Sequence, residues 1–166
     1  MQSPRIQAMI LVLPALSGCA APLSVAAMVP HDVALEKCFA GSVSVEAEGS
    51  GGSLVARATI SGESLQAAVV QALCGHELFE SVGAVGRCEW ELYVRVVELV
   101  EPETGLDMTA SLELDWLLRK RDSGSIVWNE TLASSYTATT FDETFLEERR
   151  GAALQGAVRK NIELGL

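Results

Sequence analysis

The chain has 166 residues, of which 49% are hydrophobic, and its 12 basic and 22 acidic side chains give a formal net charge of −10 at pH 7. This hydrophobic content is enough for one domain with a real core. Nucleic acid is an unfavourable partner for so acidic a chain, because binding to it relies on Lys and Arg that neutralise phosphates.

The first residues have the three-part organisation of an export signal. Met1–Gln7 is polar with a positive charge at Arg5, and Ala8–Leu16 is an almost unbroken apolar run. That run is far shorter than the ~20 residues that a helix needs to cross a bilayer. The sequence therefore predicts a targeting segment and not a transmembrane anchor.

The signal ends in Leu16-Ser17-Gly18-Cys19, which resembles the lipobox of bacterial lipoproteins. The resemblance implies cleavage before Cys19 and a diacylglycerol on its thiol, and each buried methylene of the acyl chains adds roughly 0.8 kcal/mol of membrane anchoring. Ala20 follows in place of the aspartate that marks inner-membrane retention, so the resemblance favours the periplasmic face of the outer membrane. The alternative is an ordinary signal peptide cut after Ala20.

Cleavage would leave a lipidated tether over residues 19–37 and a single domain over residues 38–166. The stretch from Ala20 to about Pro30 is rich in Ala, Pro and Ser and has no apolar period, which is typical of a linker. Residues 1–18 hold one of the 12 basic residues and none of the 22 acidic ones, so the mature charge is 11 minus 22, or −11.

The domain opens with a strand and a helix. Gly41–Glu48 alternates with its apolar residues on one face, and the glycine-rich Gly49–Ser53 ends the strand. Ser61–Phe79 has helical spacing, and Ser61 is a suitable N-cap. The apolar positions of this helix are Leu65, Ala68, Val69, Ala72 and Leu73.

Period-two alternation then predicts three strands, which start near Trp90, Met108 and Ile126 and are separated by turns. Asp142–Leu164 returns to helical spacing, with Leu146, Ala153, Leu154, Ala157 and Leu164 on one arc. The order strand-helix-strand-strand-strand-helix predicts an α+β two-layer sandwich. Its sheet would be mixed and mostly antiparallel, with two helices on one face.

This order, the lipobox at Leu16–Cys19 and the glycine-ended turn Gly105–Met108 resemble the small α+β periplasmic lipoproteins that include the lipopolysaccharide-assembly lipoprotein LptE. The resemblance covers nearly the whole mature chain through topology and export signal. It implies a structural role beside an outer-membrane partner. No functional residue of that family transfers, and the acidity of this chain disfavours direct binding of lipopolysaccharide.

Three cysteines remain after lipidation in an oxidising compartment: Cys38, Cys74 and Cys88. If the first strand and the Trp90 strand are parallel neighbours, Cys38 and Cys88 lie close together and could form a disulfide, whereas Cys74 points away from the sheet. A Cys74–Cys88 bridge is the alternative. A zinc site formed by the cysteines and His76 is less favoured, because their spacing fits no knuckle and a hydrogen-bonded core histidine is commoner.

Arg150 and Asn161 fall within the apolar arc of the last helix, which predicts a structural polar site. A buried arginine needs a partner, so we expect a bond from Arg150 to a carboxylate or carbonyl of the sheet. Contact with a ligand anion is the alternative.

The sequence contains no G-x-S-x-G elbow, and its paired carboxylates lie in exposed segments. We therefore expect no enzyme and no cofactor. The favoured role is a non-catalytic accessory or scaffold in an envelope assembly or transport complex, with the membrane bound through Cys19 and an envelope protein as partner. The alternatives are a binder of a small apolar or lipid ligand in a cavity lined by Trp90, Trp116 or Trp128, and an enzyme with a cleft around carboxylates or His76.

Overall fold

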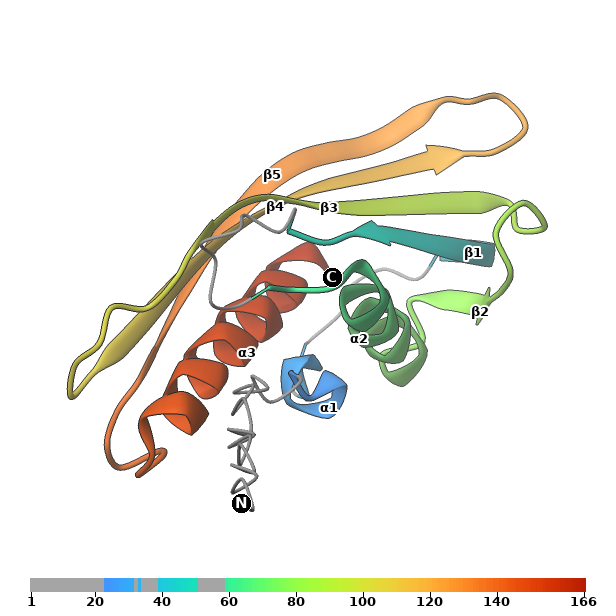
Figure 1. Cartoon of the computed structure of the whole chain (residues 1–166). Helices are drawn as coiled ribbons and strands as arrows, with labels where there is room; N and C mark the ends of the chain where they lie inside the picture. Colours follow the sequence, from blue (N-terminus) through green and yellow to red (C-terminus); the bar gives the residue numbers. More distant parts are fainter. Residues whose placement is uncertain (1–22, 32, 34–38, 51–58) are drawn as a thin grey trace, which may run out of the picture.

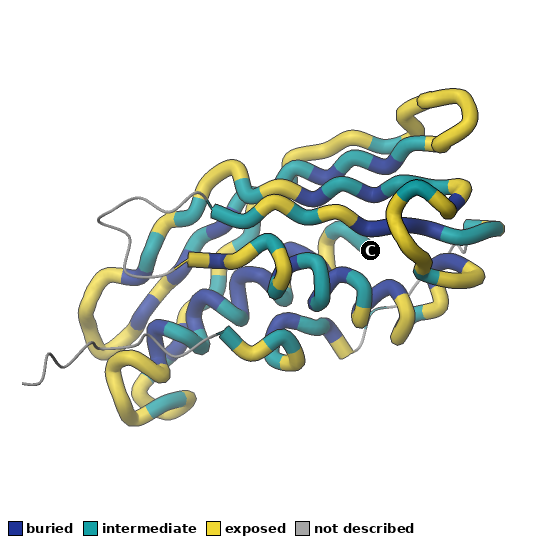
Figure 2. The backbone as a smooth tube through the Cα atoms, turned by 45° about the vertical axis from the view of Figure 1, so that its right-hand side comes forward, coloured by how far each residue is buried: buried dark blue, intermediate teal, exposed yellow. Residues whose placement is uncertain are grey.

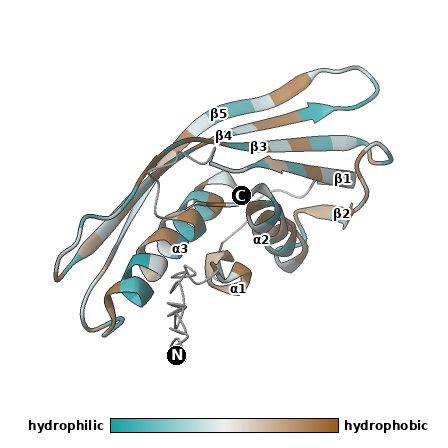
Figure 3. Cartoon of the chain, in the orientation of Figure 1, coloured by the Kyte–Doolittle hydropathy of each residue, from teal (hydrophilic) through white to brown (hydrophobic). Residues whose placement is uncertain are grey.

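The structure, a computed structural model, describes residues 23–31, 33, 39–50 and 59–166. A curved sheet covers one layer of helices (Figure 1), which confirms the predicted two-layer α+β fold. Apolar residues gather between the two layers (Figure 3). The elements are α1 Val25–Met28, β1 Phe39–Glu48, α2 Gly62–Gly75, β2 Phe79–Val82, β3 Trp90–Val100, β4 Met108–Lys120, β5 Ile126–Ala138 and α3 Leu146–Gly165.

The sheet has the order β2-β1-β3-β4-β5. β1 is parallel to both β2 and β3, while β3, β4 and β5 form an antiparallel meander whose ladders are the longer ones. The first strand and the Trp90 strand are thus parallel neighbours, which is the condition on which the Cys38–Cys88 pairing depends. Alternation in β4 buries one face of the strand, as the period of two predicted. The buried residues are Met108, Ala110, Leu112, Leu114, Trp116 and Leu118.

The helix α2 begins where the sequence predicts and ends earlier. Ser61 caps it, with the side-chain oxygen accepting from the Ser64 N–H at 3.1 Å. The helix stops at Gly75, and Glu77 has a left-handed backbone (φ 52°) that turns the chain away from the helix axis. The following residues form β2, which was not predicted because four residues are too few to show a period.

The predicted tether is wrong over the part that the structure describes. Val25–Met28 forms the helical turn α1, which packs against α2 and α3 (Figure 1). Met28 is fully buried and Pro30 is buried as well. One turn is too short to show an amphipathic period, and only the packing partners stabilise it.

The last helix begins at Leu146, four residues after the predicted start at Asp142. The Asp142 carboxylate instead accepts hydrogen bonds from the Thr139 N–H at 2.7 Å and the Thr139 hydroxyl at 2.9 Å, which closes a turn before the helix. The middle of the predicted apolar arc is buried. Leu146 and Leu164 are 43% and 58% exposed, because each lies at an end of α3 where the core stops.

Gly156 allows α3 to lie close to β5, because a Cβ there would overlap the Tyr136 ring near its attachment to the backbone. We expect Gly156→Ala to lower the free energy of unfolding by about 1–3 kcal/mol through overpacking, measured by urea denaturation. Gly151→Ala is the matched control, since a Cβ at Gly151 meets nothing within 4 Å. It should stabilise the helix by about 0.5–1 kcal/mol, and equal losses in both variants would contradict the close packing.

Candidate functional site

Two loops meet at one end of the sheet: the turn 101–107 between β3 and β4, and the loop 139–145 between β5 and α3 (Figure 1). Arg149, in the first turns of α3, joins them. Its guanidinium donates to the carbonyls of Gly105 and Leu106 at 3.0 and 3.1 Å, and to those of Glu143 and Thr144 at 3.0 Å each. The side chain therefore crosslinks both loops and α3.

Arg149 is buried, with 5% of its surface exposed, and its guanidinium donates four hydrogen bonds to backbone carbonyls. Carbonyl dipoles stabilise a buried guanidinium, whose planar fork suits several acceptors at once. An arrangement of this kind holds the backbone of two loops in fixed positions. Sequence reasoning did not single out Arg149.

The two loops present large apolar side chains to solvent, and Figure 2 shows the loop ends as exposed. Phe141 is 100% exposed, Leu106 77%, Phe145 68% and Leu146 43%. We call these four residues the apolar tip. A single exposed apolar residue is normal, whereas several on adjoining, rigidly held loops are typical of an interaction surface.

The surroundings of the apolar tip are acidic. No Lys or Arg occurs at positions 101–107 or 139–148. The hydrogen bonds from Thr139 hold the pKa of Asp142 below its usual value, so this carboxylate remains charged at neutral pH. The exposed carboxylates of the two loops and the start of α3 are those of Glu103, Asp107, Asp142, Glu147 and Glu148.

Arg150, one of the two predicted polar residues, is buried, but its predicted partner on the sheet is wrong. Its guanidinium bonds to the carboxylate of Glu147, one turn earlier on α3, at 3.1 and 3.2 Å. The side chains are 8% and 73% exposed. Arg150 Nε has no hydrogen-bond partner among the described residues. The side chain turns back along α3 and reaches the carboxylate three residues earlier on the same helix.

Asn161 is fully buried and forms the predicted structural polar site on its own. Its Oδ1 accepts from Trp116 Nε1 at 3.0 Å, and its Nδ2 donates to Leu132 O at 2.7 Å and to Ser134 Oγ at 3.2 Å. The Ser134 hydroxyl donates in turn to Ala157 O at 2.8 Å. This network fixes α3 to β4 and β5.

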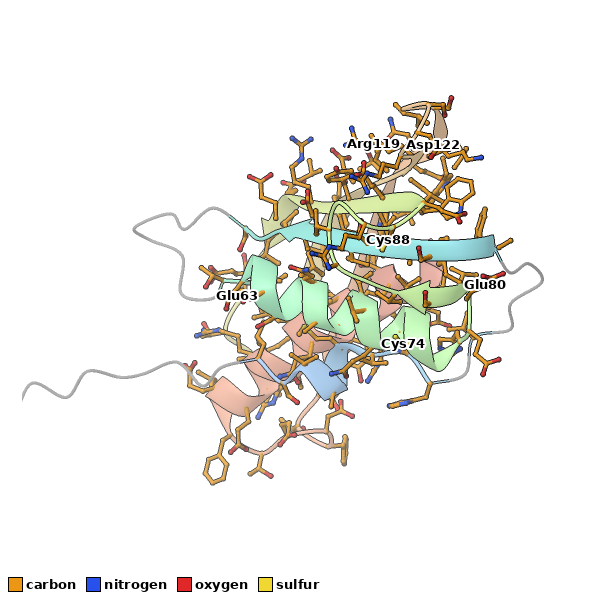
Figure 4. The ribbon with its side chains drawn as sticks, turned by 90° about the vertical axis from the view of Figure 1, so that its right-hand side faces the viewer. Glu63, Cys74, Glu80, Cys88, Arg119 and Asp122 are labelled. Carbon is orange, nitrogen blue, oxygen red and sulfur yellow. The ribbon has the colours of Figure 1, made fainter. Side chains whose placement is uncertain are left out.

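The lipidation residue Cys19 and the first predicted disulfide partner, Cys38, lie outside the described residues. Cys88 is buried and Cys74 is exposed on α2 as predicted, and the two are not bonded to each other, so the alternative Cys74–Cys88 bridge is wrong (Figure 4). Cys88 Sγ lies 3.5 Å from Ala84 O, to which it donates. The Cys38–Cys88 pairing stays a prediction.

His76 is the C-cap of α2 and is only partly buried, which corrects the expected core histidine. Its Nε2 lies 3.3 Å from Pro30 O, an acceptor, so Nε2 donates in this contact. Within the described part of the chain, no group of three His, Cys, Asp or Glu side chains could hold a metal ion.

A groove of ≈ 540 Å³ opens at the opposite end of the domain, between the sheet and the last turns of α2 and α3. Of the three tryptophans that were candidates for a cavity wall, Trp128 lines it. Trp116 is buried in the core, and Trp90 packs against Phe39 and donates to Ala40 O at 2.9 Å. The carboxylates of Glu130 and Glu163 lie beside the apolar walls.

The outer face of the sheet carries mixed charges. Arg119 donates to Glu91 at 2.6 Å and to the Tyr93 hydroxyl at 2.7 Å, and Figure 4 shows Arg119 near the end of β4. Burial first, and then the charge of Glu91, raise the pKa of Tyr93. Three arginines lie beside acids here, whereas the two loops that carry the apolar tip contain no Lys or Arg.

Asp115 on this face gives a pH-dependent prediction. Hydrogen bonds from Thr131 and then Arg95, at 2.6 Å each, hold the pKa of Asp115 below its usual value. The ionised Asp115 therefore stabilises the fold fully above the pKa of the unfolded state, about 3.9. This stabilisation is lost as the pH falls through the lower pKa of the folded state. We expect Asp115→Asn to lower Tm at about pH 7 and much less at about pH 2.5. Asp122→Asn, on an exposed turn, is the control, and a pH-independent difference for Asp115→Asn would contradict the argument.

No helix within the described residues is both long and apolar enough to span a bilayer. No family model matches the chain, and no curated protein matches it either. Solved structures do resemble it.

The chain is similar to protein XCC0632 from Xanthomonas campestris, with a TM-score of 0.57 and 14% identity over 82% of this chain and 87% of that one. It is also similar to the hypothetical protein CT253 from Chlamydia trachomatis, with a TM-score of 0.50 and 11% identity over 76% and 96% of the two chains. For a putative lipoprotein from Caulobacter crescentus, the TM-score is 0.44 and the identity is 16%, over 74% of this chain and 80% of that one. The first two likenesses concern the fold alone and support it, and the resemblance to LptE-like proteins stays a prediction.

Proposed function

We propose that the chain is the precursor of a lipid-anchored bacterial envelope protein whose domain acts by binding and not by catalysis. The export signal and lipobox at Leu16–Cys19 support the anchor. The apolar tip is the observation that supports the binding role. In this proposal the domain is an accessory or scaffold of an envelope assembly or transport complex, on the periplasmic face of the outer membrane.

The apolar tip suits docking for two physical reasons. Burial of a large apolar side chain that was exposed stabilises a complex by about 1.5–3 kcal/mol, and Phe141 and Phe145 are two such side chains. The bonds of Arg149 also hold both loops before a partner arrives, so less conformational entropy is lost on binding.

Intact mass spectrometry of the membrane fraction tests the anchor. We expect a mass that begins at an acylated Cys19, and we expect Cys19→Ala to move the protein to the soluble fraction. A soluble wild-type chain that begins after Ala20 would overturn the lipoprotein proposal.

Copurification in mild detergent tests the binding role of the apolar tip. The double variant Phe141→Ser with Phe145→Ser should lose a stoichiometric partner that the wild type retains. The control is Ile126→Ser with Val127→Ser, because these residues of β5 are 58% and 50% exposed and belong to the opposite end of the strand. Loss of the partner in both variants, or in neither, would contradict a docking role for the tip.

The groove beside Trp128 supports a second candidate function, the binding of an amphipathic ligand with an aliphatic chain. Its apolar walls suit the chain, and Glu130 and Glu163 favour a cationic head over an anionic one. Dodecylamine should therefore quench or shift tryptophan fluorescence at a lower concentration than dodecanoate. Leu164→Gln should weaken that response, since Leu164 lines the groove. Equal responses to both probes would argue against a specific site.

A further inference from the structure

The exposed charged side chains of the loops and helix start that carry the apolar tip are acidic. The exposed carboxylates of Glu103, Asp107 and Glu148 belong to the loops and helix start that carry the tip. The nearest arginines in sequence, Arg149 and Arg150, are buried and bonded within α3 and the two loops. The tip is therefore apolar at its centre and anionic around it.

The outer face of the sheet differs, because basic side chains lie among its acids. Arg95 lies 2.6 Å from Asp115, and Arg119 and Arg121 lie 2.6 and 3.9 Å from Glu91. A net charge of −10 thus does not make every surface uniformly acidic. The exposed charges around the tip are acidic, and an acidic border of this kind steers association with a positive surface.

We infer that the apolar tip docks into an apolar pocket of a protein partner whose border carries Lys and Arg. The inference rests on the proposed binding role and adds the chemistry of the partner. Phe141 and Phe145 are the anchors that fill the pocket, since buried aromatic side chains at the centre of an interface contribute most of its energy. The carboxylates face the basic border, where they set orientation and association rate.

The same charges disfavour the bilayer as the occupant. Anionic lipids give membrane surfaces a negative potential, which attracts Lys and Arg and repels carboxylates. A second copy of this chain is disfavoured for the same reason, because two identical tips would bring like charges together. The test below distinguishes a protein partner from a bilayer and from a second copy of the chain.

The test uses the full lipidated chain in cells, with a photo-crosslinking phenylalanine analogue at position 141 and, as a control, at position 126. The variant Glu103→Lys with Glu148→Lys reverses the border without touching the hydrogen bonds of Arg149 or Asp142. Glu80→Lys with Glu89→Lys is the matched control, since both residues are exposed and lie elsewhere on the domain (Figure 4 labels Glu80). The crosslinked peptides are identified by mass spectrometry.

We expect one protein to crosslink at position 141 and not at position 126, through a segment rich in Lys or Arg. Its yield should fall about tenfold in the border variant, stay unchanged in the control variant, and fall with rising salt in a detergent extract. Circular dichroism spectra that match the wild type would exclude misfolding of the variants.

Other outcomes overturn the inference. These are a crosslink to a second copy of the chain, an equal yield in the border variant, no crosslink specific to position 141, and binding of the unacylated domain to phosphatidylethanolamine–phosphatidylglycerol vesicles through Phe141. Acylation of Cys19 is measured on the same sample. Phe141→Ser could abolish the protein contact while the charge-reversed border variant keeps it. That result would reject the basic partner and leave the proposed binding role intact.

Discussion

Replacement of Arg149 by alanine is expected to lower the free energy of unfolding by about 3 kcal/mol. The guanidinium is buried, and its removal takes the donor away from the carbonyls of Gly105, Leu106, Glu143 and Thr144. The loss of four hydrogen bonds from a charged donor is costly, and the vacated volume adds a packing loss. Urea denaturation monitored by tryptophan fluorescence measures the change.

Two controls separate this effect from a general loss of charge. Arg87→Ala removes an exposed arginine and should change stability by less than about 0.5 kcal/mol. Arg149→Lys keeps the charge but replaces the planar fork with an ammonium, which cannot reach all four carbonyls in the same geometry, so its loss should be intermediate. A wild-type value for Arg149→Lys would show that charge alone matters there.

The same substitution also bears on function. If Arg149 positions the apolar tip, amide hydrogen exchange in 101–107 and 139–145 should accelerate in Arg149→Ala, while exchange in β3 and β4 stays slow. Unchanged exchange in both loops would mean that they are held by other contacts. Partner binding in copurification should weaken in step with the loss of protection.

Long periodic elements could be predicted because one face of each is buried. The alternation from Met108 to Leu118 and the spacing from Leu65 to Leu73 report that burial directly. β2 and α1 have no such signal, since each contains four residues. Their positions depend on tertiary contacts, β2 on pairing with β1 and α1 on packing against α2 and α3.

Part of the candidate site could also be predicted from the helical wheel. Asn161 and Arg150 lie on the apolar arc of α3, so their burial follows from sequence, and both are buried. The partner of Arg150 did not follow, because several carboxylates were compatible with its reach. The wheel cannot show that Glu147 on the same helix is the one bonded.

The apolar tip was missed for an identifiable reason. The predicted helix began at Asp142, so it included Phe145 as a helical residue and left Phe141 outside any predicted element. A helix start at Leu146 leaves both phenylalanines in a segment that neither the sheet nor α3 covers. Two aromatic residues in an otherwise polar connection were the available signal. For Arg149 the sequence contains no such signal, because its partners are loop carbonyls and only the fold determines where those loops lie.

Asn161→Leu is the second substitution with a large expected effect, a loss of about 3 kcal/mol. Leucine has a similar volume, so the core keeps its packing while Trp116 Nε1 and Leu132 O lose their partner. Trp116 is fully buried, so its indole N–H has no water to replace the lost acceptor. Thermal or urea denaturation at neutral pH measures the loss, with Asn129→Leu, at an exposed position of β5, as the control for the residue change itself.

A double-mutant cycle with Trp116→Phe identifies the cause of that loss. Phenylalanine removes the indole donor, so the double variant no longer leaves Trp116 Nε1 without an acceptor, and the two changes should cost less together than the sum of each alone. The expected coupling is about 1 kcal/mol, the usual size for one side-chain hydrogen bond. Strict additivity would mean that Asn161 acts through Leu132 and Ser134 alone, and that the indole bond at 3.0 Å contributes nothing to holding α3 on the sheet.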